Sequence, residues 1–276
     1  MDEFTAIEKT VRQQQNRYYG KYRGFVSDNA DPEKLGRCKL VVPSVLGETV
    51  SNWALPCTPY GGAANIGFIA VPPNGAQVIA EFMEGDISSP LWTGTFWRQA
   101  SELPEEFAAN EEPTAKVMRT ESGHVLLLDD KDGEEKIRLK SSAEAVLEMI
   151  SDGSVSVTDS GGATVTLDAN ASEIRIEDAN GNSCVMSASG MTFKDPAGNE
   201  ITTEAGGITI KAPATVTIEG ASVAIGGSGG EPLIKGSTFL AMFNAHTHVC
   251  SVPGSPSGPP VPPLTPAVLT TKSTAL

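Results

Sequence analysis

Two of the chain's three histidines stand in the tripeptide His246-Thr247-His248. In an extended strand, residues two apart point to the same side, so both imidazoles can lie on one face. Two nitrogen ligands from one chain are too few for a closed metal site. Three chains around a threefold axis would supply six ligands, so the pair predicts a metal site that depends on symmetry.

The spacing alone leaves other interpretations open. The two histidines can also be solvated imidazoles on a turn, because short motifs match by chance. In a parallel trimer, six nitrogens favour an octahedral ion, whereas zinc prefers four ligands. Imidazole also binds iron, nickel and copper, and iron(II) is our first choice. Cys250 is better explained as a small packing residue than as a further ligand.

The residues before this tripeptide must build the threefold arrangement. Residues 117–236 contain short alternating segments, bounded by Gly, Asp, Asn or Ser, that recur at roughly 7 to 11 residues. Examples are residues 154–157, 163–167, 173–176, 215–218 and 222–225. Each segment has one apolar face that it cannot bury alone, and hairpin signals are few. We therefore predict an intertwined trimeric β-helix, with an antiparallel sandwich as the alternative.

The N-terminal part divides into three regions. Residues 1–17 carry Phe4, Ile7 and Val11 at helical spacing and predict a short amphipathic helix. Residues 18–97 hold about five strands, which predicts a small OB-fold barrel. The predicted strands are residues 19–26, 37–42, 53–56, 75–83 and 91–97. Residues 98–116, rich in Glu, predict an acidic linker whose carboxylates stay solvated.

Residues 237–276 form the predicted tip. The apolar run 238–243 suits a plug at the end of a prism, and the two histidines follow it. The tail from residue 252 is rich in Pro and predicts local polyproline geometry.

Charge and composition exclude some functions. The 276 residues include 34 Asp and Glu against 20 Lys and Arg, a net charge of −14, so we expect no nucleic acid partner. A basic stretch from Arg12 to Lys39 is either a solvated face or a docking surface for an acidic partner. We expect no transmembrane helix and no signal peptide. The four cysteines form no CxxC pair and predict reduced, mostly buried thiols.

In the order of its parts, the chain resembles the central spike proteins of contractile phage baseplates, known as baseplate assembly protein V, and the VgrG spikes of type VI secretion. The resemblance rests on four stretches. They are residues 22–43, with Tyr22-Arg23-Gly24-Phe25-Val26 and Leu35-Gly36-Arg37; residues 72–90, with Pro72-Pro73-Asn74-Gly75; residues 120–130, with Thr120-Glu121-Ser122-Gly123-His124; and the β-repeat ending in the two histidines.

This resemblance implies a homotrimer with an OB-fold collar and a β-helical needle. It also implies one octahedral Fe ion per trimer, held by six histidines, which here are His246 and His248. Some relatives carry a lysozyme domain between barrel and shaft, where this chain has only residues 98–116. The 28 residues after His248 depart from short-tipped relatives.

We therefore predict a non-enzymatic spike that caps the tube and baseplate hub and pierces the target outer membrane when the sheath contracts. It would be made in a bacterial cytoplasm and act in a phage virion or an injection particle. One alternative is an oligosaccharide-binding adhesin that uses Tyr18, Tyr19 or Tyr22 as stacking platforms. Another is a hydrolase that uses carboxylates of the acidic linker.

Overall fold

A computed structural model describes residues 17–221, 223, 236–247 and 263–265. The predicted helix over residues 1–17 therefore lies outside the described residues except for Arg17. The chain forms two compact units, Met1–Ile210 and Lys211–Leu276. No helix in the described ranges is both long and apolar enough to cross a membrane.

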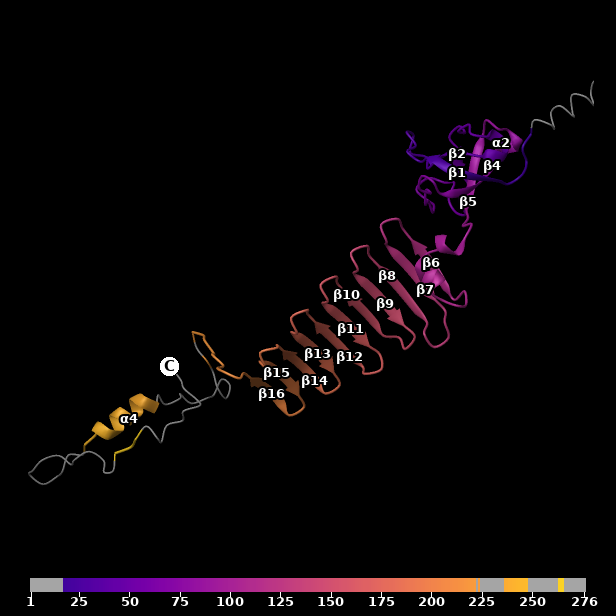
Figure 1. The fold of residues 1–276 in the computed structure, drawn as a ribbon. Helices are drawn as coiled ribbons and strands as arrows, with labels where there is room; N and C mark the ends of the chain where they lie inside the picture. The colour runs from indigo at the N-terminus through magenta and orange to yellow at the C-terminus, as the bar shows by residue number, and fades with distance from the viewer. Residues whose placement is uncertain (1–16, 222, 224–235, 248–262, 266–276) are drawn as a thin grey trace, which may run out of the picture. The chain divides into compact units, whose positions relative to one another are not determined.

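The first part of the chain is a five-stranded sheet in the order β2-β1-β4-β5-β3 (Figure 1). Its elements are β1 (Tyr22–Asp28), β2 (Lys39–Val41), α2 (Pro43–Leu46), β3 (Leu55–Pro56), β4 (Gln77–Phe82), η1 (Met83–Gly85) and β5 (Pro90–Thr95). A strand stands in each of the five places predicted. Val78, Ala80 and Phe82 alternate with more exposed neighbours and point into the core, as the period of two requires.

The core of this domain consists of small and medium apolar side chains around Trp92. Cys38 lies fully inside it, and burial raises the pKa of its thiol to about 11. Cys57 is exposed and Cys184 is half-buried, and the three cysteines within the described ranges are unpaired. The expectation of mostly buried thiols therefore holds for Cys38 alone among the described cysteines.

The segment after β5 is not the solvated linker that was predicted. It contains η2 (Ala100–Glu102) and α3 (Glu105–Ala108). Glu102 accepts hydrogen bonds from the Gln77 side chain at 2.9 Å and from the Arg98 backbone at 2.8 Å. Glu106 accepts one from Arg119 at 2.6 Å. The count of acidic residues suggested solvation, but these two carboxylates have partners far away in sequence.

The shaft is an eleven-stranded sheet in which each strand pairs with the next one along the chain (Figure 1). Its strands are β6 (Ala115–Arg119), β7 (Val125–Asp129), β8 (Lys136–Lys140), β9 (Val146–Ile150), β10 (Val155–Thr158), β11 (Thr164–Asp168), β12 (Glu173–Glu177), β13 (Ser183–Ser187), β14 (Gly190–Lys194), β15 (Glu200–Glu204) and β16 (Gly207–Lys211). The ladders are closed within one chain, so the prediction that strands of three chains intertwine is wrong for these residues.

Five nearly identical turns connect the strands on one edge of this sheet, at residues 120–124, 141–145, 159–163, 178–182 and 195–199. In each turn, the side-chain oxygen of the first residue accepts the backbone N–H of the fifth. The fourth residue has a positive φ, and it is Gly in four turns and Glu144 in one. These are hairpin turns, so the judgement that hairpin signals are few was also wrong. The first two turns include His124 and Ser141, and the Ser142 N–H donates to the His124 ring at 3.1 Å.

The sheet ends earlier than predicted. Residues 212–221 contain no strand, so the expected strand at 215–218 is absent, and most of the one at 222–225 lies outside the described residues. In the second unit, the run predicted as a plug belongs to α4 (Gly236–Ala245). Phe239 and Phe243 are four residues apart and stack on one side of this helix, with ring centroids 5.9 Å apart.

Candidate functional surfaces

The most extensive candidate surface is the apolar face of the shaft sheet. Side chains alternate between the two faces of a strand, and the antiparallel register places equivalent ones side by side across the sheet. On this face they form two columns. One runs through Leu128, Ile137, Met149, Val155, Leu167, Ile174, Met186 and Met191, and the other through Met118, Leu126, Leu139, Leu147, Val157, Val165, Ile176, Cys184, Phe193 and Ile201.

Nothing in the described chain covers this face. Leu139 is 54% exposed, Ile176 45% and Phe193 45%. Complete burial of such a side chain contributes about 1.5–3 kcal/mol, so a half-exposed one still forgoes about 1 kcal/mol. Over the two columns the sum is on the order of 15 kcal/mol per chain. Soluble monomers rarely expose so large an apolar patch, so this surface fits an interface.

The apolar face is grooved at the edge that carries the five turns. A groove of about 480 Å³ lies between the turns at 159–163 and 178–182. Its floor is apolar, with Val157, Val165, Ile176 and Cys184, and its rim is polar, with Asp178 among others. A covering partner would have to fill it with apolar side chains.

The opposite face of the sheet is polar. Arg138 pairs with Glu148 at 2.9 Å, and Arg175 pairs with Glu173 at 2.6 Å and Glu177 at 3.0 Å. Such exposed pairs stabilise the sheet little, but they mark the side that faces water.

The polar face has a small apolar core at β6 and β7. There Ala115, Val125 and Leu127 are buried, next to the strand that packs against α3. Burial is the largest single influence on Glu106 in α3 and by itself raises its pKa. The hydrogen bond from Arg119, a backbone hydrogen bond and the positive charges of Arg119 and Lys140 together outweigh burial and hold the pKa of Glu106 below its usual value. The two faces of the sheet therefore differ. The polar face contacts water and α3, and the apolar face has no cover in the described chain.

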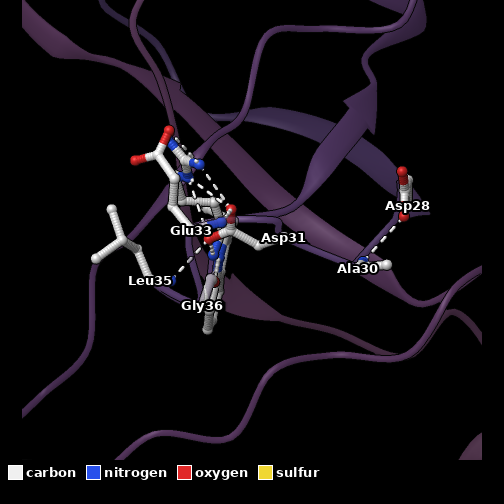
Figure 2. Close-up of polar contacts among 8 residues, drawn as sticks. Asp28, Ala30, Asp31, Glu33, Leu35 and Gly36 are labelled. Carbon is white, nitrogen blue, oxygen red and sulfur yellow. Dashed lines mark hydrogen bonds and ion pairs between the residues drawn. The ribbon is translucent and has the colours of Figure 1, made fainter.

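A dense cluster of hydrogen bonds lies in the loop after β1 (Figure 2). The Asp31 carboxylate accepts the backbone N–H groups of Glu33 at 3.0 Å and Leu35 at 2.8 Å. Arg37 donates to it from Nη2 at 2.6 Å, from Nε at 3.1 Å and from its backbone N–H at 3.3 Å. The hydrogen bond from Arg37 is the main reason that the pKa of Asp31 lies well below its usual range. Since Asp31 has five donors and stays ionised, it holds the loop in shape and cannot act as a general acid.

The predicted metal ligands are only partly described. His246 follows α4 directly, and its backbone N–H donates to the Met242 carbonyl at 3.1 Å, which continues the helical turn. The expectation of an extended strand at His246 is therefore wrong, and the argument that placed both imidazoles on one strand face does not apply. Its ring Nδ1 lies against the Phe243 carbonyl oxygen. His248 lies outside the described residues, so the pair stays a prediction.

The alternatives from the sequence gain no support from the geometry. Tyr18 and Tyr22 are partly buried and pack with Phe82, with ring centroids 5.7–6.1 Å apart, so they are not open platforms for a sugar. Tyr19 is exposed. In the acidic linker, the Arg98 backbone N–H lowers the pKa of Glu102, which therefore stays ionised at neutral pH. A carboxylate of this kind does not serve as the acid of a hydrolase.

Comparison with known proteins decides the family of the first domain. Residues 22–97 match the family model described as the type VI secretion system/phage-baseplate injector OB domain. The first domain is therefore similar to the OB domain of type VI secretion and phage-baseplate injectors. The resemblance drawn from the sequence motifs is thereby confirmed for this domain, which spans β1 to β5.

Two curated relatives point the same way. The type VI secretion system spike protein VgrG5 of Pseudomonas aeruginosa is 30% identical over 96 residues, which cover 33% of this chain and 12% of that protein. The actin cross-linking toxin VgrG1 of Vibrio cholerae is 31% identical over 118 residues, which cover 40% of this chain and 10% of that protein. The chain thus spans only a small part of the length of these relatives.

Among solved structures, the G-box domain of the microcephaly protein CPAP covers 71% of this chain at 13% identity, with a TM-score of 0.28. A similarity this low carries no argument about fold or function.

Proposed function

We propose that the chain is the central spike of a contractile injection machine, either a phage baseplate or a type VI secretion system. The observation that carries the proposal is the one-layered shaft sheet, whose apolar face has no cover in the described chain. The OB domain of the baseplate spike family at its N-terminal side supports this role. Families of this kind form part of baseplate or secretion machinery.

Three copies of the chain close the shaft in this proposal. Each copy forms one side of a three-sided prism, with its apolar columns inside and its Arg–Glu pairs outside. Side chains on the apolar face repeat at the spacing between neighbouring strands, about 4.8 Å. A partner that covers the whole face must present side chains at the same spacing, and a second copy of the sheet does so. Eleven strands at that spacing extend about 48 Å, and a five-residue strand is about 17 Å wide.

Each side of the prism would be one continuous hydrogen-bonded sheet formed by a single chain, which would make the prism rigid. Every ladder is closed within its own chain, and only the first and last strands leave an unpaired edge. Such a needle suits a mechanical role, in which it caps the tube and hub and is driven through the target outer membrane when the sheath contracts. In this proposal the protein acts in the virion or injection particle and has no enzymatic activity.

His246 and His248 would hold one octahedral Fe ion at the tip, with six imidazoles from three chains. The contact of His246 Nδ1 with the Phe243 carbonyl suits the tautomer in which Nδ1 is protonated and Nε2 carries the lone pair. Histidines that bind metals commonly donate their second nitrogen in this way. The ion would cross-link the three chains. Loss of iron, measured by elemental analysis, is expected for both His246→Ala and His248→Ala.

Cys184 offers a direct test of the prism. It lies in the second apolar column, so three copies of its thiol would face one another across the threefold axis. In the full chain with Cys57→Ser and Cys250→Ser, a short bifunctional maleimide is expected to link two chains through Cys184, and a further Cys184→Ser should abolish that product. If the chain with Cys57→Ser and Cys250→Ser gives no linked product while Cys184 still reacts with a single maleimide, the proposal fails.

A further inference from the structure

A second surface without charge lies on the OB domain. Between Glu48 and Glu81 the chain has no Asp, Glu, Lys or Arg, although 20% of all residues are charged. The middle of this stretch, residues 58–69, is a long connection between β3 and β4, which we call the apolar finger. Its large side chains face solvent, with Tyr60 63% exposed, Ile66 51% and Phe68 52%.

The apolar finger has a defined shape. The Phe68 N–H donates to the Tyr60 carbonyl at 3.1 Å, and the Ile66 N–H donates to the Ala63 carbonyl at 3.4 Å. A Cβ at Gly61 would lie 3.4 Å from the Gly67 Cα, so the two legs run against each other and leave little space for larger residues. The finger is thus held by its own backbone bonds, and a partner would not have to order it first.

Charge indicates which partner fits. One copy of the chain has a net charge of −14, so contacts between copies meet like-charge repulsion wherever acidic surface is involved. Surface without charge avoids this repulsion. The shaft's apolar face is uncharged in its two columns, and the finger has the same property on the OB domain. A basic partner, in contrast, would be attracted to the acidic surface elsewhere.

Tethering favours the same partner. In the proposed trimer, each OB domain is joined to its shaft strand β6 by residues 96–114. Three OB domains held in this way reach effective concentrations on the order of 1 mM relative to one another, at which a weak apolar contact is occupied.

We infer that the apolar finger contacts the OB domain of a second copy of the chain and closes the collar of the trimer. This inference rests on the proposed function, because it requires three chains in one assembly. It adds an interface that the shaft does not need, with Tyr60, Ile66 and Phe68 as the side chains that become buried.

Photo-cross-linking in the full chain tests the inference. The photoreactive residue p-benzoylphenylalanine replaces Phe68 in one variant and Glu48, exposed and outside the finger, in a control. Light is expected to link chains in the Phe68 variant and not in the control. Adding Tyr60→Asp to the Phe68 variant should lower the yield roughly tenfold, because it removes apolar burial and introduces a charge.

The outcomes separate this inference from the proposed function. If Cys184 links the shafts and the Phe68 variant links no chains, the finger contact is wrong and the prism stands. If the Phe68 variant captures only a different protein from assembled particles, the second copy is the wrong partner. If neither Cys184 nor the photoreactive residue at position 68 links chains, both the finger contact and the three-sided prism are wrong. Equal linking from the control position also overturns the finger contact.

Discussion

Replacing Val165 by aspartate places a carboxylate in the middle of the apolar face. Val165 lies in β11 between Val157 and Ile176 of the neighbouring strands and is 38% exposed in the single chain. In a lone sheet the new carboxylate would stay hydrated. In the prism it would lose about 1 kcal/mol of apolar burial and several kcal/mol through desolvation of an unpaired charge. The expected cost is on the order of 5 kcal/mol per chain, and three times that per trimer.

Thr166→Asp is the matched control, because residue 166 is the next residue of the same strand and points to the polar face. Its cross-strand neighbours are Ser156 and Arg175, so a carboxylate there gains a basic partner. Light scattering with size exclusion and thermal melting measure both variants. We expect Thr166→Asp to keep the trimer, and Val165→Asp to give monomers or aggregates. Unchanged mass and a melting temperature within about 2 °C for Val165→Asp would refute the buried face.

Three further predictions concern the turns and their glycines. Glu144→Gly should stabilise the protein by about 0.5 kcal/mol in urea unfolding, since Glu144 has a φ of 68°, whereas Gly162→Ala in a sister turn should cost about 1 kcal/mol. Gly190→Ala should lower the free energy of unfolding by about 3 kcal/mol, because its Cβ would lie 1.6 Å from the Thr203 carbonyl oxygen. Gly206→Ala, whose Cβ would meet nothing within 4 Å, should leave the stability nearly unchanged. Thermal melts distinguish the two variants. The Asn182 side chain lowers the pKa of Asp178 to about 2, so the stability that this turn contributes is full above about pH 4 and is lost as the pH falls towards 2. The melting temperature of Asp178→Asn should therefore fall less between about pH 4 and pH 2 than that of the wild type. An identical pH profile for the two proteins would contradict this role of Asp178.

The sequence predicts the strands better than it predicts their partners. Val78, Ala80 and Phe82 alternate clearly between glycine and proline boundaries, so the OB strands are found in place. In the shaft the strands are again found, but their pairing depends on the turns. The glycines at positions such as Gly162 and Gly181 read as boundaries between single strands, whereas their positive φ makes them hairpin turns. In each of the five turns, a Ser, Thr or Asp stands three residues before the residue with positive φ. This recurring spacing is the sequence signal that could have identified the hairpins.

The tip and the linker show why other predictions failed. The run 238–243 is apolar on all sides, and its period alone cannot separate a buried strand from a helix, which it forms as part of α4. In the linker, the partners of Glu102 and Glu106 are Gln77 and Arg119, and such pairings depend on tertiary structure. His246 and His248 could be named from the sequence, and in the proposed site the other four histidines come from two further chains.

Native mass spectrometry of the full chain, combined with elemental analysis of the same sample, tests the three-sided spike most directly. Each chain has a mass of 28.8 kDa. We expect a single species of three chains that carries one iron ion. In His246→Ala we expect the iron to be lost while the three chains stay associated. A stable monomer with the wild-type sequence, or a dimer whose apolar faces pack in a sandwich, would contradict the three-sided spike.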